Sequence, residues 1–133
     1  MQGLDLRNMV LTKKNFDHSN LSRSNLSGCD LQFCSFISSS ASNANFSFAI
    51  AKGANFRDAE MRNCNLSHSD LEKACFSGCV LENSTFSNSQ MDSVLMQKSD
   101  ARNVDFTSCV LKEIKFQNSV LTGSKFTGDF ILV

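Results

Sequence analysis

Cysteine, histidine and carboxylate side chains are the residues of this 133-residue chain whose chemistry could support catalysis or metal binding. Six cysteines and two histidines are present. The spacing typical of a zinc site, CxxC with histidines, is absent. Cysteine that alternates with serine and alanine packs as a small apolar residue. The sequence therefore predicts no metal site and structural thiols at five positions: Cys29, Cys34, Cys64, Cys79 and Cys109.

The remaining candidates for chemistry stand apart from one another. Cys75 is expected to face outward, which makes it the candidate for a reactive thiol. His18 and His68 fall on different sides of the predicted fold with no nucleophile beside them, and we expect solvated turn residues. Asp70 and Glu72 flank one apolar residue among nearby lysines, which predicts surface ion pairs and not a catalytic acid pair. We therefore expect a protein that is not an enzyme and that holds no cofactor.

An uninterrupted five-residue repeat decides where these side chains must lie. From Leu6 to Ile131, each of the 26 residues spaced five apart is Leu, Phe, Met, Ala or Ile. The residue two before each of these central positions is Ser, Ala, Cys or Val from Ser19 to Cys109. A period of five fits neither a helix nor a simple strand. Both positions are predicted to point inward, and the other three positions are predicted to face water.

Glycine and asparagine mark a second kind of position. All six glycines and seven of the thirteen asparagines stand two residues after a central position. Both residue types tolerate positive φ, so a corner is predicted every five residues. The other six asparagines directly precede a central position, where we expect a ladder of side-chain hydrogen bonds from coil to coil.

The central phenylalanines show a longer period of 20 residues. When the central positions are sorted in fours, phenylalanine occurs on only two opposite sides. This pattern indicates a four-sided coil, with coils stacked about 4.8 Å apart into a rod of about six and a half coils and about 30 Å. One core column contains Phe46, Phe86, Phe106 and Phe126, and the opposite one contains Phe16, Phe36, Phe56, Phe76 and Phe116.

Segments such as Ala54-Asn55-Phe56 and Ser69-Asp70-Leu71 match A(D/N)LXX, the consensus of the pentapeptide-repeat family. The chain resembles this family over essentially its whole length. The resemblance implies an all-β fold, a right-handed quadrilateral parallel β-helix, and it supplies the handedness. We expect a single domain over residues 1–133. Its terminal coils are expected to be irregular, at roughly 1–14 and 127–133, because solenoids need capping.

Charge and hydropathy argue against several classes of partner. The chain has 13 basic and 13 acidic residues, so no bulk electrostatic attraction favours nucleic acid or an acidic membrane. No apolar run resembles a signal peptide or could span a bilayer. We expect a bacterial, cytoplasmic protein that binds neither nucleic acid nor membrane, or alternatively a secreted effector without a classical signal peptide.

One outward feature departs from the polar pattern. Phe33, Ile37, Phe48 and Ile50 occupy positions that are expected to face water in the second and third coils. A contiguous apolar patch can mark a binding surface. We predict a non-catalytic protein-interaction or scaffold module that binds another protein through these residues. The apolar segment Phe130–Val133 is expected to lie across the end of the stack, or alternatively to form a homodimer contact at the C-terminal end.

The family resemblance implies two alternative functions. Some pentapeptide-repeat proteins protect DNA gyrase from quinolones and are thought to mimic duplex DNA with an acidic rod. Similar repeats also serve as the docking or targeting domain of bacterial secreted effectors. The neutral charge balance and the absence of loops between repeats favour the interaction module over the gyrase protector.

Overall fold

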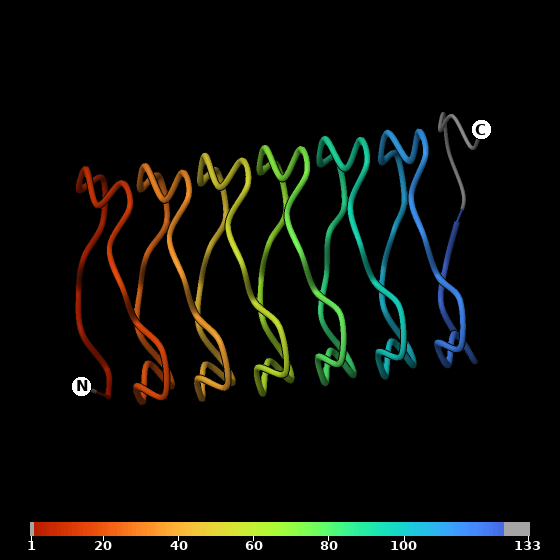
Figure 1. Cartoon of the computed structure of the whole chain (residues 1–133), viewed down its shortest axis with the longest axis horizontal. Coiled ribbons are helices and arrows are strands. Elements are labelled where there is room, and N and C mark those ends of the chain that lie inside the picture. The colour runs from red at the N-terminus through yellow and green to blue at the C-terminus, as the bar shows by residue number, and fades with distance from the viewer. Residues whose placement is uncertain (1, 127–133) are drawn as a thin grey trace.

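The chain winds into a rod of stacked coils (Figure 1), and the computed structural model describes residues 2–126. The N-terminal residues lie at one end of the long axis and the last described residues at the other. The expectations for residues 127–133, which include an irregular last coil and a covering or dimer-forming role for Phe130–Val133, lie outside the described residues. No helix among residues 2–126 has the length and apolar character needed to cross a bilayer.

The backbone pairs with itself in a 20-residue register. Residues 2–126 form no helix and no extended strand, and the pairing consists of isolated parallel bridges. Each bridge joins residues 20 apart, from Asp5 with Asn25 to Asp105 with Lys125. Both residues of each of these pairs stand directly before a central position, so one such bridge occurs every five residues. The described chain is therefore an all-β, parallel β-helix in which four repeats bring the backbone back beside itself.

Each repeat uses its backbone groups in the same way. The N–H of the central residue Phe56 donates to the carbonyl of Cys75 at 2.7 Å, and the N–H of the corner residue Asp58 donates to the carbonyl of Ser77 at 3.0 Å. The N–H of Ala59 closes the corner on the carbonyl of Phe56 at 3.1 Å. The rod is thus held along its axis by hydrogen bonds that need no particular side chain.

Every corner residue adopts the left-handed backbone conformation. From Gly3 to Gly123, φ lies between 55 and 76° at each position two after a centre, in twenty non-glycine residues and five glycines. The prediction of a corner every five residues is confirmed for the described chain. Lysine, arginine and phenylalanine adopt this conformation at some corners, because the hydrogen bonds on either side of the corner fix the backbone.

The central and small positions form the core. From Leu21 to Leu111 every residue of both kinds is buried. Phe16, Phe36, Phe56 and Phe76 stack face to face, with successive ring centroids 4.6 to 5.0 Å apart. Stacked rings at this spacing gain dispersion energy beyond their buried area.

The second phenylalanine column meets the first edge to face. Phe86, Phe106 and Phe126 stack with centroids 5.5 and 4.9 Å apart. Phe116 of the first column meets Phe106 and Phe126 edge-on at 5.7 and 6.1 Å. Phe46 likewise meets its neighbours in the first column edge-on, with centroid distances of 6.0 and 5.8 Å. The two columns together fill the middle of the rod with aromatic rings.

Cys79 and Ser84, both in the small inward position, make the same hydrogen bond. The Cys79 thiol donates to the carbonyl of Phe56 at 2.7 Å, and the Ser84 hydroxyl donates to the carbonyl of Met61 at 2.7 Å. In each case the acceptor is a central residue of the preceding coil. Serine can therefore replace cysteine in this bond, although the Ser69 and Ser99 hydroxyls donate instead to the carbonyl three residues earlier in the chain.

The first coil keeps a regular backbone, so the expectation of an irregular coil over residues 1–14 is wrong for the described part. Asp5 and Val10 bridge to the next coil like later residues, and Asn8 and Lys13 have the corner φ of 61 and 60°. The small position accepts only small residues where neighbouring coils pack around it, and this restriction is relaxed at the end of the rod. Met9 is 45% exposed, so its larger side chain needs no change in the backbone.

The six asparagines that precede a centre cap their own repeat, and the expected coil-to-coil ladder is wrong. The Asn65 side-chain oxygen accepts the backbone N–H of Ser67 at 2.9 Å. In residues 2–126 no backbone carbonyl accepts the N–H that follows a central residue. A local turn satisfies this donor more directly than a neighbouring coil could. The same contact occurs at Asn15, Asn20, Asn25, Asn45 and Asn55.

Candidate functional site

Apolar side chains reach solvent at two corners and on the side between them. Phe33 and Phe48 are each 62% exposed, and Ile50 is 44% exposed. Ile37 is only half-buried, and its backbone N–H donates to the Asp17 carboxylate at 2.8 Å. We call Phe33, Phe48 and Ile50 the corner patch. Ile37, which we expected to face water, exposes only part of its side chain.

The ring of Phe33 lies over a glycine of the next coil. A Cβ atom built on Gly53 would stand 2.7 Å from two carbons of the Phe33 ring, closer than real Cβ contacts allow. The ring thus fills the space that a side chain at residue 53 would take. Beside the ring is a hollow of about 150 Å³, lined by Phe33, Lys52, Gly53, Glu72 and Lys73. The corner patch therefore has charged groups of both signs at its border.

The ring of Phe48 stacks on a histidine that the sequence analysis treated as a solvated turn residue. The Phe48 and His68 rings are 4.8 Å apart and nearly parallel, at 3°. His68 is exposed, yet it extends the aromatic surface of the patch by one coil. The signal for this contact was present in the sequence, because residues 48 and 68 are 20 apart and therefore share a corner.

The ion pairs expected on the side of Asp70 and Glu72 are present. The Lys52 ammonium lies 3.5 Å from each of these carboxylates, and Lys73 lies 3.8 Å from Glu72. The pKa of Lys52 is raised, first by the charge of Asp70 and then by that of Glu72. These groups are at least partly exposed to solvent, so each pair contributes little to stability.

A second ion-pair network, which was not predicted from the sequence, lies on the opposite side of the coil, two repeats away from Asp70. Arg102 contacts Asp100 at 2.6 Å and Glu82 at 3.6 Å, and Arg62 contacts Glu82 at 3.5 Å and also Glu60. The hydrogen bond from Arg102 lowers the pKa of Asp100. Because these charges neutralise one another, this side offers no strong field to a partner.

The inward thiols are in environments that suppress their reactivity. All six cysteines are free. Burial raises the pKa of Cys64 to about 12 and that of Cys109 to about 11, and it raises the pKa of Cys79 as well. Cys75 is half-buried. Within residues 2–126 no three His, Cys, Asp or Glu side chains come together in a way that could hold a metal ion.

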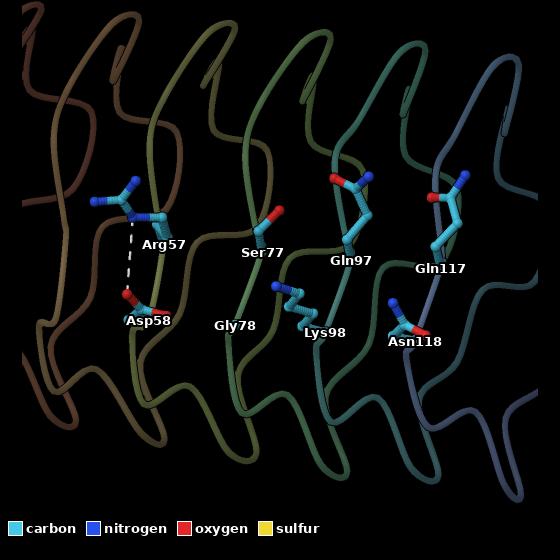
Figure 2. A pocket seen from close by; sticks show the side chains of 8 residues that line it. All are labelled: Arg57, Asp58, Ser77, Gly78, Gln97, Lys98, Gln117 and Asn118. Atoms are coloured by element: carbon cyan, nitrogen blue, oxygen red, sulfur yellow. Dashed lines mark ion pairs between the residues drawn. The ribbon is translucent and has the colours of Figure 1, made fainter.

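A polar groove of about 420 Å³ crosses four coils on the side of the rod that carries Cys75 (Figure 2). Its floor is low because Ser77 has a short side chain and Gly78 has none, whereas the lining residues of the neighbouring coils have longer side chains. Gln97 and Gln117 stand side by side on successive coils, and Lys98 points toward Gly78. The groove is lined by Arg57, Asp58, Ser77, Gly78, Gln97, Lys98, Gln117 and Asn118.

Together the register, corners and stacked core define a solenoid repeat protein built on a parallel β-helix. Pentapeptide repeats, in eight copies, match residues 1–36, 42–78, 64–100 and 74–113. The chain therefore belongs to the pentapeptide-repeat family, whose known structures are right-handed β-helices.

Solved structures are similar to this chain at low sequence identity, and one of them has a TM-score that supports the same fold. The pentapeptide repeat protein Rfr23 from the cyanobacterium Cyanothece 51142 is 16% identical with a TM-score of 0.70, and the match covers 92% of this chain and 91% of that one. HetL from Nostoc sp. strain PCC 7120, described as involved in heterocyst differentiation regulation, is 16% identical over 97% of this chain and 87% of its own, with a TM-score of 0.46. Trypsin-treated QnrB1, a plasmid-mediated fluoroquinolone resistance protein, is 20% identical with a TM-score of 0.46. That match covers 92% of this chain and 65% of QnrB1. A comparison with curated protein sequences gives no match.

Proposed function

We propose that the protein is a non-catalytic interaction or scaffold module that binds another protein through the corner patch. The observation that carries this proposal is the backbone of Phe33 and Phe48, both of which have a φ of 59°. Every described corner has this left-handed backbone, which is unfavourable for a bulky residue, so a large aromatic side chain there calls for a reason beyond the fold. Both rings are also mostly exposed, so burial gives little in return. Among the described corners, these two alone carry a large apolar side chain.

The rod supports this role by displaying the patch on a rigid surface. We infer a four-sided coil of 20 residues and about six and a half coils over the whole chain. The bridges between residues 20 apart and the corner in every repeat support this geometry. Solenoids of this kind bind partners through long regular surfaces, and function depends on what those surfaces carry.

The two alternative functions have less support. A gyrase protector that mimics DNA needs an acidic rod, whereas the sides of this rod carry lysines and arginines between their carboxylates. A docking domain of a secreted effector would use the same kind of interaction surface, so it is a special case of the proposal. A secreted effector differs from the proposed module in its cellular compartment. Fractionation of the source cells measures this compartment directly.

The proposal is tested by removing the apolar surface without disturbing the coil. We expect Phe48→Ser combined with Ile50→Ser to weaken binding of a partner recovered by pull-down by about 2 kcal/mol or more, the scale of an interface hot spot. Thermal stability should stay nearly unchanged, because surface substitutions have small effects.

A matched control uses exposed apolar residues elsewhere on the rod. Leu95 and Val120 are 36 and 46% exposed and lie outside the corner patch. Replacing both by serine should leave partner binding unchanged. A partner that is insensitive to the Phe48 and Ile50 substitutions, or equally sensitive to the control, would contradict the proposal.

A further inference from the structure

We propose that the polar groove is a second interaction surface, which binds an extended acidic peptide segment of a partner along the axis of the rod. The groove lies on a different side from most of the corner patch, and the observations that support it are independent of that patch. Three features define the ligand: the local charge, the hydrogen-bonding groups of the walls and the spacing of the cations.

The side that holds the groove has an excess of positive charge in an otherwise neutral protein. Between residues 55 and 118, its outward and corner positions carry Arg57, Lys98 and Lys115 against Asp58 alone. The Arg57 guanidinium is 3.7 Å from Asp58, and neither lysine makes an ion pair with any residue of the described chain. The Asp17 carboxylate lies near the other end of this side and accepts hydrogen bonds from Ser35 and Ile37. The groove therefore favours an anionic partner by charge complementarity.

The position of Lys98 directs this charge into the groove. Its side chain extends toward the coil of Gly78 (Figure 2). A Cβ atom at Gly78 would be only 2.1 Å from the Asp58 side-chain oxygen, so the Asp58 carboxylate leans over the same corner from the other coil. A carboxylate of the ligand would bind Lys98 on the side away from Asp58, where repulsion is weakest.

The walls of the groove suit a peptide backbone. The side chains of Gln97 and Gln117 stand parallel on neighbouring coils, and Asn118 follows Gln117 on the same coil (Figure 2). Each primary amide offers two donors and an acceptor, which matches the N–H and C=O groups of an extended peptide. Ser77 adds a hydroxyl on the floor of the groove.

The separation of the cations sets the spacing of the acidic residues. The backbones of Arg57 and Lys98 belong to coils two apart, about 10 Å along the axis, and the Lys98 side chain reaches back toward the coil between them, so the two charges are somewhat closer than this. In a polyproline II segment, side chains three residues apart point the same way and are separated by about 9 Å. The groove should therefore select a peptide with acidic residues at positions i and i+3.

The test measures fluorescence anisotropy of labelled peptides at low ionic strength with the full chain. The probe is a flexible peptide of about eight residues with glutamates at i and i+3, and the matched probe has glutamines there. We expect the glutamate peptide to bind about ten-fold more tightly than the glutamine peptide, and added salt to reduce the difference. Lys98→Gln should weaken the glutamate peptide by about three- to ten-fold.

The control is Lys73→Gln, which removes a cation at an equivalent corner outside the groove, where the side chain is 73% exposed. Its effect should stay below about two-fold. The double substitution Phe48→Ser with Ile50→Ser should not change peptide binding, which separates this proposal from the corner patch. Thermal melts check that each variant is folded.

Four results would overturn the proposal. They are no binding of the glutamate peptide, equal binding of the two peptides, and equal losses for Lys98→Gln and Lys73→Gln. The fourth is tighter binding of a single-stranded oligonucleotide than of the glutamate peptide with the same dependence on Lys98, which would identify a nucleic acid as the partner.

Discussion

Phe56 and Phe33 show how the place within a repeat decides what an aromatic side chain contributes. Phe56 is a central residue, 1% exposed, with stacked neighbours at 4.6 and 4.8 Å. We expect Phe56→Ala to lower the free energy of unfolding by about 3–5 kcal/mol, because a ring-sized cavity would interrupt the column. Phe33→Ala should cost less than about 1 kcal/mol, because its ring is largely in solvent. Denaturant unfolding of the two variants gives the comparison, and equal losses would contradict the assignment of inside and outside.

The cysteines allow the same inside–outside assignment to be tested chemically. The pKa of Cys64 is raised to about 12 and that of Cys79 is also raised, so at pH 8 both are protonated as well as buried. We expect a maleimide or disulfide reagent to label Cys75 first in the folded protein, with the five inward thiols reacting only after unfolding. Intact mass spectrometry and peptide mapping measure the order of labelling. If Cys64 or Cys79 were labelled as fast as Cys75, the small inward position would not be buried as assigned.

Single residues were predictable from the sequence where the repeat alone determines their environment. The period of five distinguishes Phe56 from Phe33, although both are phenylalanines. The environments of Ile37 and His68 require the 20-residue period as well, because they depend on which side chain stands 20 residues away. Ile37 is partly covered next to Asp17, and His68 stacks on Phe48. A repeat of five assigns the direction of a side chain, whereas its neighbours follow from the coil length.

At the scale of the repeat, the corner is the feature that distinguishes this fold from an ordinary sheet. Ser38 is an exposed corner residue with a φ of 56°. Ser38→Val should lower the free energy of unfolding by about 1–2 kcal/mol, because a β-branched residue disfavours left-handed backbone. Ser38→Asn should be neutral or stabilising by about 0.5 kcal/mol, since asparagine tolerates this conformation. Chemical denaturation compares the variants.

A nearby serine provides the control for the corner. Ser40 is also exposed, but it is a bridge residue without positive φ, and valine occupies the same kind of position at Val80. Ser40→Val should therefore be tolerated. If Ser40→Val destabilised the protein as much as Ser38→Val, the cost would come from exposing an apolar side chain and not from the corner backbone.

Glycine and asparagine predicted the positions of the corners, but they did not predict that other residue types would adopt the same backbone conformation. Glycine and asparagine occupy only about half of the described corners. The remaining corners, such as Lys73, Glu113 and Phe48, have the same positive φ without those residues. The asparagines before the centres were assigned to the wrong contact for a related reason. Composition shows that a polar side chain recurs, whereas the choice between a partner two residues away and one in the next coil depends on which N–H the backbone leaves free.

At the scale of the molecule, the distribution of charge discriminates between the functions open to this family. The total charge of zero is visible in the sequence, but its separation into sides is not. In the folded coil, lysines and carboxylates alternate on the side of Lys52 and Asp70. Arginines and carboxylates alternate on the side of Arg62 and Glu82. The side that holds the groove has a net positive charge. No side of the described rod presents the continuous negative charge of a nucleic acid backbone.

This distribution predicts that the protein does not act on gyrase as a mimic of DNA. A DNA-binding surface is basic and is matched by closely spaced negative charges. On this rod each carboxylate of the larger clusters lies within 4 Å of a lysine or arginine, as in the contacts of Asp70 with Lys52 and of Glu82 with Arg102. We expect purified protein at micromolar concentration not to restore supercoiling by gyrase in the presence of a fluoroquinolone. A gel assay of supercoiling, with a known protecting protein as the positive control, makes the measurement. Restoration of supercoiling would contradict both this expectation and the proposed function, and it would place the interaction on a surface other than the corner patch.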